Sequence, residues 1–326
     1  MKIAILDDYQ DAVRRLECFK LLHGLDVKVF QHGAKGLGQL AIRLADFDVL
    51  VLIRERTALN RALISKLPKL KLICQTGRIG SHVDLEAAAE RQITVVEGVG
   101  DPVAPAEMTW ALILGASRKL PQYANLMKQG VWQSSSINPE RNTIGRTLNG
   151  RTLGIWGYGR IGQLVSRYAK AFGMHVMVWG SEASRFKAGE HGFITAQSKE
   201  ELFMQSDVLS LHLRLSERTQ HIVSEQEFSL MKPDALFVNT SRAELIAPNA
   251  LEKALKSGRP GFAALDVFDV EPVPPTHSLL RLENVLATPH IGFVEQDSYE
   301  RYFHPVFEAV HAFVHGLPIK TIVAKA

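Results

Sequence analysis

The sequence predicts an α/β protein built from two doubly wound parallel sheets. Short β-branched runs alternate with longer helical patterns along nearly the whole chain. Strand, helix and strand in repetition indicate a parallel sheet that helices cover on both faces. The alternation occurs in two series, and 326 residues suffice for about two domains of roughly 100–200 residues each.

The first series contains five expected strands. Helical stretches such as 36–45 and 84–92 lie between them. The expected strands are 2–6, 27–30, 48–53, 69–75 and 93–98.

The second series follows a long apolar helical stretch, 103–120, and a looser polar segment, 129–145. A six-strand sheet is expected from it, and a glycine-rich turn follows the first of its strands. The expected strands are 152–157, 175–180, 207–213, 235–241, 261–267 and 284–290.

The sequence predicts helix boundaries at a few positions. Ser224 followed by Glu227 has the spacing of a capping box, which predicts a helix start, and Pro233 ends that helix. The chain closes with a helix expected near 294–315 and a strand-like run at 319–324.

Composition indicates an ordinary globular chain. Apolar residues make up 46% and charged residues 22%, which allows an ample core. The net charge of +4 is small for this length and is not concentrated in any run, so nucleic acid is not an expected partner. No apolar run approaches the roughly 18 residues of a membrane span, and the start MKIAILDD is too short for a signal-peptide core. Cys18 and Cys74 lie among apolar residues, so we expect buried free thiols and a cytoplasmic location.

The turn GYGRIG, residues 157–162, fits the pattern G-x-G-x-x-G. In this pattern Gly157 allows the tight turn, Gly159 lets the backbone approach a pyrophosphate, and Gly162 lets the helix pack on the strand. The turn follows an apolar strand and opens a helix whose N–H groups face the phosphates, as the motif requires. Arg160 and Ile161, inside the turn, are expected to share in binding a dinucleotide.

Polar residues follow three strand ends of the second series. Arg242 follows one strand, Asp266 and Glu271 follow the next, and His290 follows the last. Because ligands bind at the carboxyl ends of strands in an open parallel sheet, these side chains are expected to converge beside the nicotinamide end of a cofactor. Each alone has an ordinary explanation as a surface arginine, a satisfied histidine or a Glu-Pro turn.

Together these residues suit the reduction of a carbonyl group. A protonated histidine can donate a proton to the oxygen on which charge develops, and a neighbouring carboxylate raises the histidine pKa. A guanidinium can polarise the carbonyl and grip an adjacent carboxylate through its forked donors. We therefore expect catalytic roles for Arg242, Glu271 and His290.

The chain resembles the D-isomer-specific 2-hydroxyacid dehydrogenases nearly end to end. The most specific pieces are GRTLGIWGYGRIG, AFGM, LFVNTSRAELI, ALDVFDVEP and NVLATPHIG. The resemblance implies a Rossmann nucleotide-binding domain, 99–292, inserted into a flavodoxin-like substrate domain, 1–98 and 293–326. It also implies an oxidoreductase that acts on a small 2-oxo or 2-hydroxy acid, such as glyoxylate, hydroxypyruvate or phosphoglycerate, and a homodimer formed through the helix at 103–120.

The resemblance assigns roles to the residues at the strand ends. It implies that Arg242 binds substrate, that His290 is the acid/base and that Glu271 is its partner. Asp266 would lie near the nicotinamide carboxamide, and Thr240 and His212 would line the cofactor cleft. Departures from the family pattern are Ala243, where glycine is usual, and Arg214, where proline is usual.

The loop that holds the substrate carboxylate in this family matches QTGRIGSHVD, residues 75–84, with altered spacing. Arg78 is a departure that could add a charge for an acidic substrate or could simply be solvated. Ile79 belongs to the same loop and is expected to bind substrate. Arg54 matches a stretch that carries an arginine in phosphoglycerate-type members, and it too is expected to contact substrate.

The acid that holds the ribose of NAD would fall at Gly180, and it is missing. Its absence removes the repulsion of a 2′-phosphate, Ser181 could donate to that phosphate, and Arg185 lies four residues on. The sequence therefore favours NADP over NAD. Glu182 could instead take the ribose hydroxyls and keep NAD, and Arg214 is a second candidate for the phosphate.

Two function classes stay open. The favoured one is the enzyme just described, and no metal is expected in it. The alternative is a nicotinamide-sensing, corepressor-like binding protein of the same fold, because such relatives can retain the catalytic residues. The sequence does not specify which 2-hydroxy acid is the substrate.

Overall fold

The structure is a computed structural model that describes residues 1–34 and 36–322. The chain divides into two compact units, Met1–Asp101 with Val294–Ala326, and Pro102–Phe293. The expected divisions lay a few residues earlier, after 98 and after 292. Every strand pair in both sheets is parallel, which confirms the expected fold class. None of the helices in the described ranges has the length and apolar character that crossing a membrane requires.

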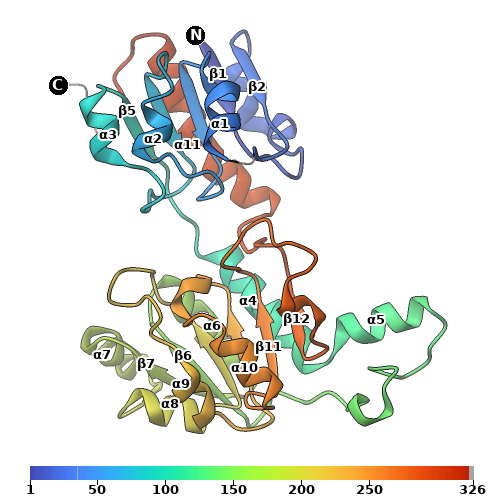
Figure 1. Ribbon diagram of the computed structural model, residues 1–326. Helices are drawn as coiled ribbons and strands as arrows, with labels where there is room; N and C mark the ends of the chain where they lie inside the picture. The colour runs from blue at the N-terminus through green and yellow to red at the C-terminus, as the bar shows by residue number, and fades with distance from the viewer. Residues whose placement is uncertain (35, 323–326) are drawn as a thin grey trace. The chain divides into compact units, whose positions relative to one another are not determined.

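The first unit contains a five-stranded sheet in the order β2-β1-β3-β4-β5 (Figure 1). This is the flavodoxin-like order, with a topological switch point between β1 and β3. Its central strands are buried on both faces because helices cover both sides, so they read as continuous apolar runs. The strands are β1 (Lys2–Ile5), β2 (Asp26–Val29), β3 (Val49–Leu52), β4 (Leu72–Gln75) and β5 (Thr94–Glu97).

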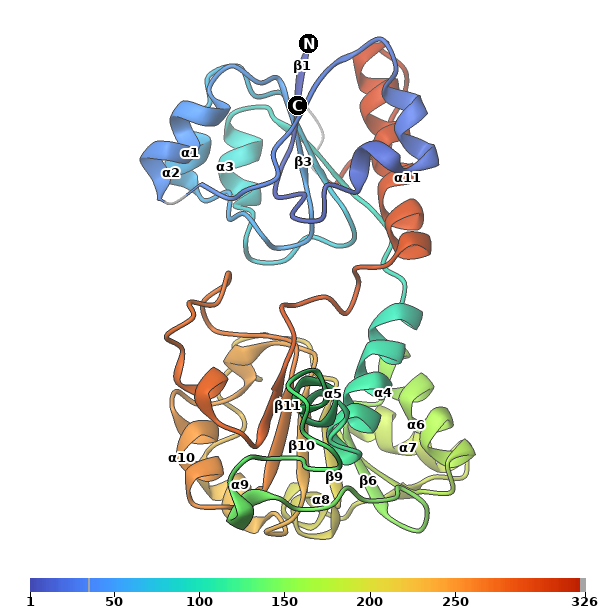
Figure 2. The same cartoon turned by 90° about the vertical axis from the view of Figure 1, so that its right-hand side faces the viewer.

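Helices from the two ends of the chain cover this sheet. One face carries α1 (Leu37–Leu44), α2 (Arg61–Ile64) and α3 (Leu85–Glu90), and the other carries α11 (Gln296–Val314) with the short helix η2 (Glu17–Leu22) (Figure 2). The C-terminal helix thus belongs to the N-terminal sheet.

The strand-like run expected at 319–324 is wrong for its described part. Residues 319–322 form no strand, although the N–H of Ile322 donates to the carbonyl of Val95 at 2.9 Å. One such bond without a continuing ladder does not make a strand. Residues 323 and 324 lie outside the described residues.

The second unit contains a seven-stranded sheet in the order β12-β11-β10-β9-β6-β7-β8. All six expected strands form, and the seventh, β8, has only two residues, too few for a sequence pattern. Because the strand order reverses between β6 and β9, the switch point of the sheet lies there. The strands are β6 (Thr152–Trp156), β7 (His175–Trp179), β8 (Ile194–Thr195), β9 (Val208–Leu211), β10 (Leu236–Asn239), β11 (Phe262–Leu265) and β12 (Val285–Ala287).

Two core layers lie on the two faces of this sheet. On one face Trp110, Val165 and Ala188 pack from α4, α6 and α7, and on the other Phe203 and Phe228 pack from α8 and α9, with α10 alongside. The helices are α4 (Val103–Ser117), α6 (Arg160–Ala171), α7 (Glu182–Glu190), α8 (Lys199–Gln205), α9 (Glu225–Leu230) and α10 (Ala250–Lys256).

The single helix expected at 103–120 is wrong at its end. Helix α4 ends at Ser117, Lys119 takes a left-handed conformation with φ of 54°, and α5 (Leu120–Lys128) starts in a new direction. Pro121 explains the break, because inside a continuous helix its ring would clash with the preceding turn and it lacks an N–H donor. Helix α5 and the loop after it project from the rest of the second unit (Figure 1).

The capping box predicted at the start of α9 forms. Glu227 accepts hydrogen bonds from the N–H and the hydroxyl of Ser224, both at 2.7 Å, and from the ammonium of Lys199 at 2.6 Å. Burial opposes the charged form, but these three donors outweigh it and lower the pKa of Glu227 to about 2. The carboxylate therefore stabilises the fold wherever it is ionised.

Glu227→Gln should lower the free energy of unfolding by about 1–3 kcal/mol at neutral pH, because the half-buried Lys199 side chain and the helix start lose a charged acceptor. The folded pKa lies below the unfolded value of about 4.3, so the stabilisation is complete above about pH 5 and is lost as the pH falls towards 2. Urea unfolding of both proteins should therefore show a difference that narrows on acidification.

The matched control is Glu225→Gln, which removes an exposed partner of Lys253 from the first turn of the same helix. It should change stability by less than about 1 kcal/mol. A Glu227→Gln deficit that stays constant from neutral to acidic pH would show that the ionised carboxylate is not what stabilises the helix start.

Candidate functional site

The glycine turn connects the carboxyl end of β6 with α6. Gly157 has φ of 101°, and a Cβ there would lie 2.6 Å from the carbonyl oxygen of His212. A Cβ on Gly162 would lie 2.3 Å from the carbonyl oxygen of Gly157, so the strand and helix meet with no room for a side chain. A Cβ on Gly159 would meet no atom within 4 Å. The first and third glycines are thus required by packing, and the middle one leaves open space in front of the backbone.

That open space lies at the start of α6. The helix begins at Arg160, whose side chain is exposed, and Ile161 is half-buried behind it. The first N–H groups of a helix have no intrahelical acceptor and carry the positive end of the dipole. A pyrophosphate fits here, at the switch point of the sheet, and the residues present suit a dinucleotide.

The segment after β7, where an acid is missing, is a helix start and not a loop. Ser181 caps α7, with its hydroxyl oxygen accepting from the N–H of Ser184 at 3.3 Å. Arg185 lies in the first turn, and its guanidinium carbon is 4.6 Å from the centre of the Trp179 ring. Helix α7 thus brings Arg185 back over Trp179.

Two further residues expected beside the cofactor lie at strand ends. His212 follows β9, its Nε2 is 3.0 Å from the hydroxyl of Ser210, and burial lowers its pKa to about 4. It is therefore neutral at physiological pH. Thr240 follows β10, and its hydroxyl is 2.7 Å from that of Thr109 on α4. Arg214, two residues beyond His212, is exposed.

Asp266 fixes the segment that carries His290. One carboxylate oxygen accepts from the Thr288 hydroxyl at 2.6 Å and the Ile291 N–H at 2.9 Å, and the other accepts from the Gly292 N–H at 2.7 Å. The residue is 1% exposed, and burial raises its pKa. Its oxygens serve the protein's own donors, so Asp266 positions the loop around His290.

His290 and Glu271 form a direct pair. Nδ1 of His290 is 2.7 Å from a carboxylate oxygen of Glu271, whose other oxygen accepts from the N–H of Phe268 at 2.9 Å. Burial opposes the charged carboxylate, but the hydrogen bond and charge of His290, the Phe268 N–H and the charge of Arg242 together hold the pKa of Glu271 below its usual value. Glu271 is therefore paired with His290 and lies within the electrostatic influence of Arg242, so side chains that follow three different strands act around this one carboxylate.

The pair also fixes the tautomer of the imidazole. An ionised carboxylate only accepts hydrogen bonds, so Nδ1 of His290 must be the donor. The other ring nitrogen, Nε2, is then the atom that can exchange a proton with a bound molecule. His290 has φ of 52°, a left-handed conformation that is uncommon outside glycine and that clusters at functional sites.

In the first unit, Arg54 and the loop after β4 come together at the carboxyl edge of the sheet. The N–H of Arg54 donates to the hydroxyl of Thr76 at 2.9 Å. Its guanidinium lies over Gly77, where a Cβ would be only 2.0 Å from Nη1. Arg78 is exposed, and the N–H of Ile79 donates to Glu97 at 3.0 Å. The N–H of Ile79, a residue that the sequence assigned to substrate binding, thus already donates to the protein's own Glu97.

Asp7 and Arg56 also lie at this edge, and neither was expected there from the sequence. Asp7 follows β1, is buried and has φ of 60°, and Arg56 donates to its carbonyl oxygen at 2.7 Å. Arg54, with φ of 53°, is left-handed as well. Left-handed residues thus follow strand ends in both units. No sequence pattern predicts them, because aspartate, arginine and histidine usually have negative φ values.

Comparison with known proteins gives concordant results. The family model described as D-isomer specific 2-hydroxyacid dehydrogenase, NAD binding domain, matches residues 110–292. A D-3-phosphoglycerate dehydrogenase of Methanocaldococcus jannaschii is 36% identical over 87% of this chain, which spans only about half (53%) of that relative. A glyoxylate reductase of Thermococcus litoralis is 35% identical over 86% of this chain and 84% of its own length.

A solved structure is more similar still. The crystal structure of a phosphoglycerate oxidoreductase from Vibrio cholerae O395 is 51% identical, with a TM-score of 0.94 over 97% of this chain and 99% of the other. Similarity of this extent, together with the family model, confirms the resemblance seen in the sequence motifs. The chain belongs to the D-isomer specific 2-hydroxyacid dehydrogenase family and contains the NAD binding domain of that family.

Proposed function

We propose that the protein is an NAD(P)-dependent oxidoreductase that interconverts a small 2-oxo acid and a D-2-hydroxy acid. The observation that carries the proposal is the pairing of His290 with Glu271, near Arg242, in the unit that also holds the open dinucleotide turn. Glyoxylate, hydroxypyruvate and phosphoglycerate-type acids are the substrate candidates, because relatives are named for the first two and for phosphoglycerate.

The side chains divide the work of carbonyl reduction. When bound, the reduced nicotinamide supplies the hydride. The guanidinium of Arg242 binds the substrate carboxylate and stabilises the negative charge that develops on the carbonyl oxygen. Nε2 of protonated His290 donates a proton to that oxygen, and Glu271 stabilises the protonated ring through Nδ1. In the reverse direction the same nitrogen takes the proton from the hydroxyl group.

The remaining sequence assignments continue as parts of this proposal. Thr240, His212 and Asp266 lie beside the cofactor, with Asp266 acting through the loop that it anchors. Arg54, Arg78 and Ile79 bind substrate. Because Glu97 accepts from the Ile79 N–H, an incoming carboxylate must displace Glu97 to use that donor. An acidic substrate that also binds the guanidinium of Arg54 or Arg78 would offset the loss of the contact between Glu97 and the Ile79 N–H.

The cofactor preference follows from the end of β7. A 2′-phosphate would meet the N-terminus of α7, the Ser181 hydroxyl and the guanidinium of Arg185, with no acid at Gly180 to repel it. The half-buried Arg185 is held against Trp179, so little side-chain entropy remains to be lost on binding. These features support NADP over NAD, although Glu182 stands next to Ser181.

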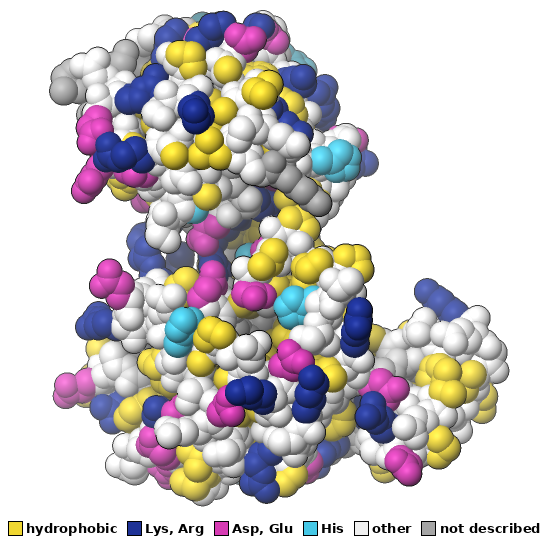
Figure 3. All heavy atoms as spheres, viewed as in Figure 1, with side chains coloured by type: hydrophobic (Ala, Val, Ile, Leu, Met, Phe, Trp, Pro, Cys, Tyr) yellow, Lys and Arg dark blue, Asp and Glu magenta, His cyan; other side chains and the backbone are white. Residues whose placement is uncertain are grey.

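The homodimer and the cytoplasmic location also belong to the proposal. Helix α5 and the segment after it expose large apolar side chains, among them Leu120, Met127, Trp132 and Ile137 (Figure 3). Exposed apolar surface of this kind marks protein interaction sites. A second copy of the chain is the proposed partner, and small organic acids are the proposed ligands.

The first test is turnover with a substrate panel and both cofactors. The protein should oxidise NADPH with glyoxylate or hydroxypyruvate at a higher kcat/KM than NADH. Arg185→Ala should lower kcat/KM for NADPH by about 10–150-fold, the equivalent of a charged hydrogen bond, and leave that for NADH nearly unchanged. Arg167→Ala, an exposed arginine on α6, is the control. Binding of NADPH without turnover of any 2-oxo acid would favour the corepressor-like alternative, and a clear wild-type preference for NADH would refute the NADP assignment.

The second test addresses the proton donor. His290→Ala should lower kcat by about 10²–10⁴-fold. Reduction requires the protonated ring, so the rate should fall as the pH rises, and Glu271→Gln should move that alkaline limb to lower pH because the stabilising negative charge is gone. Asp269→Asn, a carboxylate on the same loop that contacts His277, should leave the limb in place. A limb that does not move in Glu271→Gln would show that the pair has no catalytic role.

The third test addresses Arg242. Arg242→Lys keeps the positive charge but loses the forked donors, so kcat/KM for 2-oxo acids should fall by about tenfold or more. Arg259→Lys controls for a general effect of exchanging arginine for lysine. Arg259 donates to the carbonyl of Met231 and is not part of the proposed site. Near-full kcat/KM in Arg242→Lys would remove the bidentate role from Arg242.

A further inference from the structure

A cavity lies at the opposite edge of the second unit's sheet from the glycine turn. It has a volume of about 200 Å³ and is lined by residues at the amino ends of β6, β9, β10 and β11. Arg151 precedes β6, Val208 opens β9, Leu236 opens β10 and Phe262 opens β11. In a parallel sheet these ends face away from the carboxyl ends, so the cavity shares no residue with the proposed active site.

Lys119 lines this cavity with its side chain. Lys119 is 8% exposed and lies in the break between α4 and α5. Its ammonium lies 4.7 Å from the centre of the Phe262 ring, and the described ranges provide it with neither a hydrogen-bond acceptor nor an ion-pair partner. Burial lowers the pKa of Lys119, the charge of Arg146 adds to that effect, and Glu283 opposes it.

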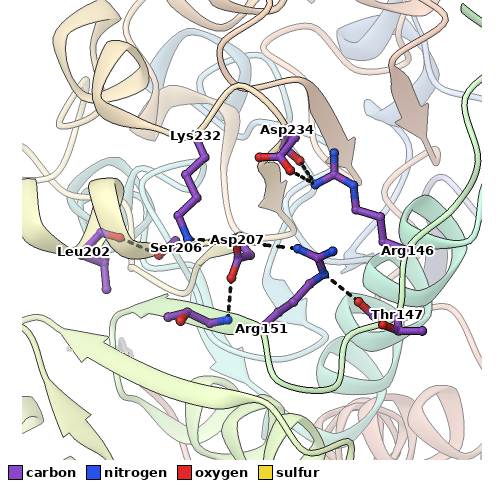
Figure 4. Close-up of polar contacts among 9 residues, drawn as sticks. Arg146, Thr147, Arg151, Leu202, Ser206, Asp207, Lys232 and Asp234 are labelled. Atoms are coloured by element: carbon purple, nitrogen blue, oxygen red, sulfur yellow. Dashed lines mark hydrogen bonds and ion pairs between the residues drawn. The ribbon is translucent and has the colours of Figure 1, made fainter.

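The two acids that line the same cavity already have cationic partners. Asp234 binds the guanidinium of Arg146 at 2.6 Å (Figure 4). Asp207 accepts from Lys232 at 2.8 Å and from the N–H of Thr152 at 2.8 Å, and Arg151 lies 3.9 Å away (Figure 4). Neither of these two carboxylates pairs with Lys119, so within the described residues its ammonium has no anion in direct contact.

Much of the remaining lining is apolar. Leu148, Leu236 and Phe262 contribute hydrocarbon surface beside Lys119 and Arg146. An inorganic ion alone would leave this surface unused, and a purely apolar molecule would leave the ammonium unpaired at a cost that burial makes large. A molecule with one anionic group and a compact apolar body satisfies both parts of the lining.

We propose that this cavity binds a small organic oxyanion, a carboxylate or phosphate group on a compact apolar body, with the anionic group against Lys119. The contact of Lys119 with Phe262 is compatible with this, since a cation over an aromatic face keeps its other N–H donors available. The site is separate from Arg242 and His290, so its occupancy is measurable without turnover.

The test uses the full chain labelled with ¹³C-lysine, in which the Lys119 side-chain signal is assigned by its absence in Lys119→Met. Benzoate and phenyl phosphate carry the two anionic groups on one ring, and benzyl alcohol is the neutral control. At least one of the two anions should shift the Lys119 signal saturably, and benzyl alcohol should not. Which anion does so tells whether the site takes carboxylates, phosphates or both.

Calorimetry then quantifies the contribution of the charge. Lys119→Met should weaken binding of the effective anion about tenfold or more, as expected for a lost charged hydrogen bond, and Lys128→Met on α5 should not. Anions that bind at Arg242 instead would leave the Lys119 signal unmoved. An unmoved signal with both anions, an equal shift with benzyl alcohol, or unchanged affinity in Lys119→Met would overturn the proposal.

Discussion

Both oxygens of Asp266 accept hydrogen bonds from the segment that carries His290, and the candidate site depends on this arrangement. A buried carboxyl group is unfavourable unless donors surround it, and here Thr288, Ile291 and Gly292 provide them. A Cβ on Gly292 would lie 3.0 Å from the Asp266 carboxylate, so glycine permits the close approach of the N–H. The same contacts hold His290 in a left-handed conformation that costs on the order of 1–3 kcal/mol elsewhere. The ring is thereby fixed against Glu271 before any ligand arrives.

Because the strands of the second sheet are parallel, different functional residues lie at its two edges. Every carboxyl end lies on one edge, which gathers the glycine turn, Arg242, Glu271 and His290 although they are far apart in sequence. Every amino end lies on the other edge, where the charged residues Arg151 and Asp207 directly precede β6 and β9. One topology therefore produces a polar candidate site at one edge and, separately, a partly charged cavity at the other.

The sequence predicted features that depend on local pattern. The glycine spacing, the Ser224–Glu227 box and the polar residues at strand ends could be read directly, because each is set by neighbours in the chain or by strand direction. Features that depend on contacts with other residues could not be predicted from the sequence. Nothing near Ile79 in the sequence indicates that Glu97 accepts from its N–H, and only the start of α7 at Ser181 brings Arg185 over Trp179. The helix break at Lys119 could have been predicted from Pro121, but the long apolar stretch before it favoured one continuous helix.

In the proposed mechanism, ionised Glu271 fixes the imidazole of His290, with a proton on Nδ1 and with Nε2 left to exchange protons with substrate. The most direct measurement is ¹⁵N NMR of histidine-labelled protein, with the His290 ring signals assigned by their absence in His290→Ala. We predict that Nδ1 carries a proton throughout the neutral and alkaline range, while Nε2 alone changes its protonation state with pH. A neutral ring protonated on Nε2, with a bare Nδ1 facing Glu271, would contradict this role of the pair.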